Sequence, residues 1–294
     1  MKLASMLFLL FFIAGCSEKS PNVNAGAPEF TLQCDLNSLY TPVAERISSL
    51  KTSEEQPVQI TVIAIHGKNG SPLNLHMQTL KTNLNAAGYD VIMPYMPWSG
   101  IQWDGSLCDG ISYINELIIE ERNRVGSNYI LLVGHSLAGP VTLAYSALAD
   151  TEKADRASIV APGHFIHQSG ILAEEHAASI SLAKSMVSSA QGDTIATFQT
   201  YNNGVPVAIS ATALDYLSMH DTSQFPDILS SIPLVTTPTL WLAGQNDPLT
   251  STAKTLGVID AIPVSVNASI QYKEVTGNHF TVLENVPTEL SEFF

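Results

Sequence analysis

The sequence predicts an α/β protein built on a doubly wound, mostly parallel sheet. Strand patterns and helix patterns alternate along the chain. The strand runs are apolar throughout, without alternating polar residues, and this is typical of strands buried on both faces of a parallel sheet. Residues 31–294 contain no repeat, charge block or second low-complexity linker, so their length favours one large domain.

Each predicted element has its own signal. The first strand, 59–65, is rich in β-branched residues, and the first helix, 73–87, has helical spacing and stops before Gly88. The second strand, 90–93, closes on Pro94. The remaining patterns predict helices at 110–125 and 140–149, and strands at 129–133, 157–160, 239–242 and 270–275.

The first 30 residues are set apart from the folded domain. Residues 1–15 are apolar after Lys2, and Ile13-Ala14-Gly15-Cys16 resembles the lipobox of a bacterial lipoprotein signal peptide. The apolar run is shorter than the about 20 residues that span a bilayer. We expect cleavage before Cys16, a lipid on its thiol, and a flexible tether over 16–30. Ser17 favours the outer membrane, with the domain facing the periplasm; an ordinary signal peptide with an unmodified Cys16 is the alternative.

Charge and cysteine content restrict the partners. The chain has 13 basic and 27 acidic residues and a net charge of −14, so it repels phosphate backbones and nucleic acid is excluded as a partner. If Cys16 is acylated, Cys34 and Cys108 remain. In an oxidising compartment they form a disulfide, or they are two unrelated buried thiols. The sequence does not predict an oligomeric state.

The most informative motif follows the predicted strand 129–133. Residues 134–139 read GHSLAG, a strand, a sharp turn and a small-residue helix start, which together are typical of an exposed nucleophilic serine at Ser136. The motif resembles the GxSxG elbow of the α/β-hydrolases, with Gly134 and His135 as structural neighbours and Ala138 in place of the last glycine. With HGKNG, MPWS and APGH, the sequence is similar to exported bacterial α/β-hydrolases over residues 58–290, apart from an insertion. The alternative is a serine in an ordinary turn.

This resemblance implies a catalytic triad in the order serine, acid, histidine. Asp247 follows the strand 239–242 through a glycine turn, and His279 follows the strand 270–275. Asp247 would orient His279, and His279 would take the proton of Ser136. The alternatives are a helix-capping or turn-forming Asp247 and a surface-loop His279.

The HGKNG segment after the first strand resembles the turn that supplies half of an oxyanion hole. By that match, the backbone N–H groups of Lys68 and Leu137 would hold the oxyanion. His66 is expected to be structural, tying the loop by a side-chain hydrogen bond. Gly67 and Gly70 are expected to adopt unusual backbone angles.

Residues from about 164 to 231 form the expected insertion, which resembles the helical cap of many α/β-hydrolases. Helical patterns cover 170–190 and 193–200, and irregular segments follow. Surface helices far from the site are the alternative. Tyr95, Trp98 and His164 follow predicted strands and are candidate pocket residues, although the two aromatics also suit a core position and His164 also suits a helix cap.

The sequence contains no metal-binding or phosphate-binding motif, so no metal and no cofactor are expected. The predicted function is a serine hydrolase, first a carboxylesterase, acting on a small-molecule ester or thioester. An aminopeptidase-like enzyme is the second reading, and a carboxylate pair in the insertion would favour it; Glu174 and Glu175 are adjacent but point about 100° apart on a helix. A non-catalytic lipoprotein that binds a ligand is the third.

Overall fold

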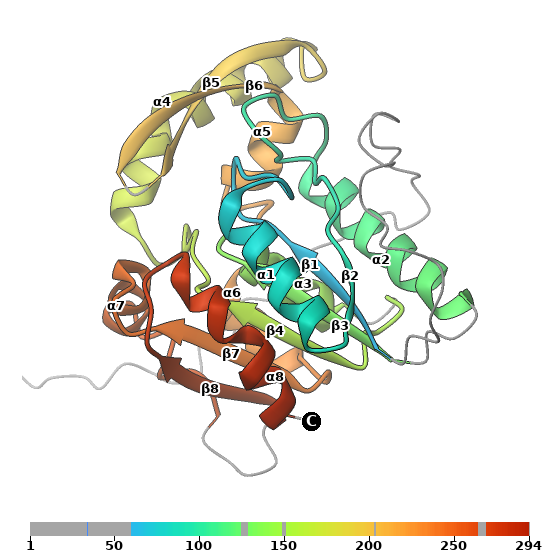
Figure 1. Cartoon of the computed structure of the whole chain (residues 1–294). Helices are drawn as coiled ribbons and strands as arrows, with labels where there is room; N and C mark the ends of the chain where they lie inside the picture. The colour runs from blue at the N-terminus through green and yellow to red at the C-terminus, as the bar shows by residue number, and fades with distance from the viewer. Residues whose placement is uncertain are drawn as a thin grey trace, which may run out of the picture.

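A parallel six-stranded sheet forms the centre of the computed structural model, which describes residues 34, 60–124, 129–148, 151–202, 204–263 and 269–293. Its strand order is β2-β1-β3-β4-β7-β8, and every neighbouring pair is parallel (Figure 1). The strands are β1 (Thr61–Ile65), β2 (Asp90–Ile92), β3 (Ile130–His135), β4 (Arg156–Val160), β7 (Thr239–Gly244) and β8 (Ile270–Val275). All six predicted strands are confirmed, with shifts of one or two residues at their ends.

Helices cover both faces of this sheet because its strands are apolar on both sides. Val62 and Ala64 of β1 belong to a core that includes residues of α1 (Leu75–Ala86) and α8 (Val286–Phe293). Ile63 and Ile65, which point the other way, belong to a second core with α2 (Leu107–Asn123) and α3 (Ala138–Ala147). The doubly wound α/β class is therefore confirmed.

Capping explains where α2 begins. The pattern predicted a helix at 110–125, but α2 starts at Leu107 because Ser106 and Asp109 form a reciprocal capping box. Outside the segment between β4 and β7, two short helices that the sequence analysis did not predict are α7 (Pro248–Thr255) and α8, with the 3₁₀ turn η3 (Thr281–Asn285) before α8. Each is too short to show a clear helical period in sequence.

The insertion, meaning the segment between β4 and β7, contains both helices and strands. It consists of α4 (Gly170–Ser188), β5 (Ile195–Asn202), β6 (Val205–Thr212), α5 (Ala213–His220), α6 (Ile228–Ser231) and the 3₁₀ turn η2 (Ile232–Leu234). Figure 1 shows α4, β5 and β6 beyond one end of the central sheet. The hairpin is anchored to the loop before α2, since the Trp103 N–H donates to the Ser210 carbonyl at 2.8 Å.

The predicted helix at 193–200 is wrong, and so is the purely helical character of the insertion. Residues 195–202 form β5, which pairs with β6 in an antiparallel hairpin. Phe198 and Thr200 are buried and their neighbours are more exposed, a period of two that belongs to a strand. Gly204, at φ 74°, takes the left-handed conformation that a tight hairpin turn needs.

A disulfide joins Cys34 to Cys108, near the start of α2, across a sequence separation of 74 residues. The predicted signal peptide 1–15, the lipidation site Cys16 and the tether 16–30 lie outside the described residues. Within the described part of the chain, no helix combines the length and apolar character needed to cross a bilayer.

Removing the disulfide is expected to destabilise the protein, because the unfolded chain regains the entropy of a long open loop. Replacing both Cys34 and Cys108 by serine should lower the free energy of unfolding by about 2–4 kcal/mol. Chemical denaturation without reductant measures this. Dithiothreitol should bring the wild type to the same midpoint as the double variant, and an unchanged midpoint in both experiments would contradict the expectation.

Candidate active site

Loops from five strands meet at one edge of the sheet. In a parallel sheet the carboxyl ends of the strands lie together, and ligands bind in the crevice there. The segments that follow β1, β3, β4, β7 and β8 carry Lys68, Ser136, His164, Asp247 and His279. The fold thus collects at one edge residues that are far apart in sequence.

Ser136 occupies the sharp turn between β3 and α3. Its φ of 58° lies in the left-handed region, which costs a non-glycine residue roughly 1–2 kcal/mol. Backbone hydrogen bonds hold this conformation: the Ser136 N–H donates to the Val160 carbonyl at 3.0 Å, and the Ser136 carbonyl accepts from Gly139 and Gly163. The turn is therefore fixed to the end of β4, and the hydroxyl faces the crevice.

Gly134 permits the close packing of α3 behind this turn. A Cβ at this position would lie 2.2 Å from the Ala138 carbonyl oxygen and 2.3 Å from Thr142 Oγ1. Since the first of these atoms is helix backbone, α3 has to move to accept any side chain.

We therefore expect Gly134→Ala to lower the free energy of unfolding by about 1–3 kcal/mol and to reduce activity as the turn shifts. Urea denaturation measures the first effect. Gly170→Ala is a matched control, because its added Cβ meets no atom within 4 Å at the start of α4. Equal stability of the two variants would contradict the close-packing explanation.

Ser136, His279 and Asp247 form a continuous chain of hydrogen bonds. Ser136 Oγ lies 3.0 Å from His279 Nε2, and His279 Nδ1 lies 2.9 Å from Asp247 Oδ2. The Asp247 side chain is 0% exposed and that of His279 is 12% exposed, so water has little access to the bond between them. The structure brings together the three residues that the sequence identified as acid, base and nucleophile.

Asp247 also serves as a helix cap, so the two interpretations of this residue hold together. Its Oδ1 accepts a hydrogen bond from the Leu249 N–H at 3.0 Å, at the start of α7. Its Oδ2 faces His279. The helix start thereby fixes the carboxylate orientation.

The loop that carries His279 is fixed by His135, a contact that the sequence did not indicate. The His135 Nε2–H donates to the His279 carbonyl at 2.8 Å. Burial lowers the pKa of His135 far below its usual value, so the ring is neutral. Asn278 Oδ1 adds two bonds, from the N–H groups of Phe280 and Thr281. The backbone position of His279 is thus fixed from both sides.

The HGKNG loop passes directly against the serine. A Cβ on Gly67 would lie 2.6 Å from the Cβ of Ser136. The expectation of unusual angles at Gly67 and Gly70 is wrong: Asn69, at φ 55°, is the residue in the left-handed region. The two glycines are instead positions where other atoms approach the backbone closely. A Cβ on Gly70 would lie 2.8 Å from the Gly67 carbonyl oxygen.

Lys68 and Leu137 both line the cavity beside Ser136. Within the described part of the chain, neither of their backbone N–H groups donates to a protein acceptor. Two N–H donors therefore remain available at the place where the sequence predicted the oxyanion hole.

His66 links the HGKNG loop to the loop after β2. Its Nδ1–H donates to the Gly67 carbonyl at 2.8 Å, and its Nε2 accepts from Ser99 Oγ at 2.8 Å. Burial lowers the pKa of His66 to about 4, so the ring is neutral at physiological pH. Since its two ring nitrogens bond to Gly67 and Ser99 and not to Ser136, its position is that of a structural residue.

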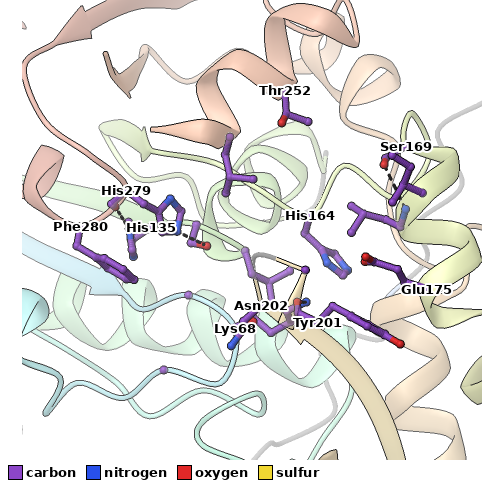
Figure 2. A pocket seen from close by; sticks show the side chains of 18 of the residues that line it. Lys68, His135, His164, Ser169, Glu175, Tyr201, Asn202, Thr252, His279 and Phe280 are labelled. Carbon is purple, nitrogen blue, oxygen red and sulfur yellow. Dashed lines mark hydrogen bonds between the residues drawn. The ribbon is translucent and has the colours of Figure 1, made fainter. Parts of the chain in front are cut away.

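A cavity of about 410 Å³ opens in front of Ser136 (Figure 2). Its apolar lining includes Leu137, Ile171, Leu172, Leu249 and Phe280. Residues of α4 and β5 form part of its wall. The alternative, in which the insertion lies far from the site, is therefore wrong for these two elements.

Of the three candidate pocket residues, only His164 lines the cavity. Its Nε2–H donates to the Met219 carbonyl at 2.6 Å, and Ser169, not His164, caps α4. The pocket assignment of Trp98 is wrong, because its side chain is 0% exposed and packs against Gly110 in the core. Tyr95 is also absent from the lining.

Comparison with known proteins shows similarity in structure only. No protein-family model matches the sequence, and no curated protein matches it. Est1E from Butyrivibrio proteoclasticus is 16% identical, with a TM-score of 0.52 over 81% of this chain and 88% of that chain. The α/β hydrolase GrgF from Penicillium sp. sh18 is 15% identical, with a TM-score of 0.58 over 80% and 87%. A monoacylglycerol lipase from Paleococcus ferrophilus is 17% identical, with a TM-score of 0.54 over 80% and 93%. The chain therefore has the fold of the α/β-hydrolase superfamily.

Proposed function

We propose that this protein is a serine hydrolase that cleaves a small to medium carboxylic ester or thioester. The observation that carries the proposal is the unbroken chain of hydrogen bonds from Ser136 through His279 to Asp247. An alcohol, an imidazole and a buried carboxylate in this order activate a serine for acyl transfer. The solved structures of the same fold include the esterase domain of a Rhodothermus marinus protein and a monoacylglycerol lipase, and another is of Est1E with ferulic acid bound.

The first half of the proposed reaction forms an acyl-enzyme. Ser136 Oγ attacks the substrate carbonyl carbon while His279 Nε2 takes its proton. The negative charge that develops on the carbonyl oxygen is held by the backbone N–H groups of Lys68 and Leu137. Asp247 accepts the Nδ1–H of His279, which fixes the tautomer and stabilises the imidazolium. The imidazolium then gives its proton to the leaving alcohol or thiol.

The second half releases the acid. Water enters when the alcohol leaves, His279 removes its proton, and the oxygen attacks the acyl carbon bound to Ser136. The same two N–H donors hold the second oxyanion, and the proton returns to Ser136 Oγ when the acid departs. The insertion forms part of the wall of the cavity in front of Ser136, through residues of α4 and β5.

Among the described residues that line the pocket there is no carboxylate pair of the kind that would favour peptidase chemistry. A peptidase of this kind would be favoured by a pair of carboxylates that binds the free amine of the substrate. Glu175 lines the cavity, but Glu174 is exposed on α4 and does not. The pair is therefore split between the pocket and the outer surface.

A fluorophosphonate probe tests the proposal directly, because it labels activated serines. Peptide mass spectrometry of the labelled protein should find the adduct on Ser136, and p-nitrophenyl esters should be hydrolysed faster than aminoacyl anilides. Labelling at another residue, or no labelling, would favour the alternative of a non-catalytic binding protein. Faster turnover of the anilides would favour the peptidase.

We also propose that the enzyme is exported and held at a bacterial membrane by a lipid on Cys16. The predicted membrane is the outer membrane, with the folded domain facing the periplasm. The Cys34–Cys108 disulfide supports an oxidising compartment. Metabolic labelling with an alkyne fatty acid should label the wild type and not Cys16→Ser. Equal labelling of the two proteins would contradict the anchor.

A further inference from the structure

Two opposite charges line the cavity, one from the core and one from the insertion. Lys68 follows β1, and Glu175 lies on α4. The cavity lining within the described residues contains no other Asp, Glu, Lys or Arg. Figure 2 shows Glu175 on the side opposite His279 and Phe280. The pocket therefore has a charged region as well as its reacting centre.

The Lys68 ammonium has spare hydrogen-bonding capacity. Its Nζ donates to the Tyr201 carbonyl of β5 at 2.6 Å, and it makes no other hydrogen bond or ion pair with a described residue. An ammonium carries three donors, so two remain. Burial lowers the pKa of Lys68 to about 7, and the charge of Glu175 acts in the opposite direction. A ligand that accepts a hydrogen bond here would relieve part of the cost of burial.

Glu175 likewise has unused capacity, as a hydrogen-bond acceptor. Its carboxylate is half-buried and makes no hydrogen bond or ion pair with any residue of the described ranges. It is near enough to Lys68 to affect its pKa, yet the two groups form no ion pair. A donor and an acceptor thus face the cavity with a gap between them.

We propose that Lys68 and Glu175 form a subsite for a neutral hydroxyl group of the substrate. A hydroxyl accepts from the ammonium and donates to the carboxylate, which uses both groups without adding charge. The hydroxyl belongs to the acyl chain or to the alcohol portion, and the neighbouring Ile171, Leu172 and Leu249 suit the hydrocarbon that carries it. This inference deepens the proposed function and rests on it.

Charged groups fit this subsite less well. A substrate carboxylate would be attracted by Lys68 but repelled by Glu175. A substrate ammonium would be attracted by Glu175 but repelled by Lys68. A plain alkyl chain would offer neither a donor to Glu175 nor an acceptor to the two unused donors of Lys68. A single hydroxyl is the group that satisfies both side chains.

The test compares matched substrates on the whole protein. Four ethyl esters of six-carbon acids, ending in a methyl, hydroxyl, carboxylate or ammonium group, probe the acyl side. Hexyl acetate and its ω-hydroxy analogue probe the alcohol side. In one of the two series, the hydroxyl substrate should exceed its plain counterpart in kcat/KM by about 10- to 100-fold, the range expected for hydrogen bonds to charged groups.

Variants assign this preference to the two side chains. In Lys68→Met and in Glu175→Gln, the ratio of kcat/KM for hydroxyl over plain ester should fall towards one. Because it is a ratio within each variant, it does not depend on how much overall activity remains. Glu174→Gln is the matched control, since Glu174 is adjacent but exposed and outside the cavity, and it should keep the wild-type ratio.

Several results would overturn the subsite: a wild-type ratio near one in both series, a preference for the charged esters, or a preference that survives both substitutions. These results can be distinguished from a failure of the proposed function. If the proposed function itself is wrong, even the plain esters are not hydrolysed and the fluorophosphonate probe does not label Ser136.

Discussion

Replacing Ser136 by alanine is expected to lower kcat for ester hydrolysis by about 10⁴- to 10⁶-fold. The alanine has no oxygen to attack the carbonyl, while His279 and Asp247 keep their mutual hydrogen bond. The oxyanion donors and the pocket remain, which explains why a small residual rate is expected. Purified enzyme and a chromogenic ester of a short acid suffice for the measurement.

A glycine variant separates chemistry from backbone strain at the same position. Ser136→Gly should be as inactive as Ser136→Ala, but more stable than it by about 1 kcal/mol, because only glycine adopts φ near 58° without steric cost. Thermal denaturation followed by circular dichroism gives the comparison. Substantial activity in either variant would show that another residue is the nucleophile.

Replacing Asp247 by asparagine is the second substitution with a large expected effect, a decrease in kcat of about 10⁴-fold. An amide at this position can present its N–H₂ to His279 Nδ1, which favours the tautomer with a proton on Nε2. That ring nitrogen then cannot accept the proton of Ser136. The loss is therefore expected in kcat, since the pocket that binds the substrate is unchanged.

Asparagine at residue 247 should leave stability nearly unaltered, because its Oδ1 can still accept from the Leu249 N–H at the start of α7. Asp247→Ala loses the cap as well, and should cost about 1 kcal/mol of unfolding free energy in addition to the activity. Equal stability of the two variants would mean that the capping hydrogen bond contributes nothing to the free energy of unfolding. Near-normal kcat in the asparagine variant would remove Asp247 from the proposed triad.

The parts of this structure that the sequence predicts are those set by local pattern. Most of the core strands are apolar runs, and Gly134, Ser136 and Ala138 lie within a few residues of one another at a strand end. Asp247 could be placed because it follows the apolar strand β7 at its carboxyl end, and His279 because it follows the last predicted strand, the more polar β8. In a parallel sheet that position fixes the edge at which the loop emerges.

Contacts between distant segments could not be predicted in this way. Nothing near His135 indicates that its ring donates to the His279 carbonyl, 144 residues away. The bond from Lys68 to Tyr201 depends on how the insertion folds back over the core. Trp98 was named as a pocket candidate although an aromatic after a strand is more often part of the core, and its side chain is buried there.

The 193–200 error has a different origin. Residues 193–200 read DTIATFQT, and four of them (Thr194, Ile195, Thr197 and Thr200) are β-branched, a composition that favours a strand and that the helix prediction overlooked. Its partner β6 decides the matter, since pairing with Val205–Thr212 stabilises the extended form. Local preference and strand pairing therefore agree here.

The position of β8 has a consequence for how the enzyme loses activity. This strand is the last of the described strands and forms one edge of the sheet, and its middle residues are less buried than those of β7. Peripheral strands detach at lower temperature than the centre of a sheet. Because β8 delivers the base while the nucleophile stands on the central β3, mild heating should abolish turnover a few degrees before the molecule melts. Cooling should then restore it.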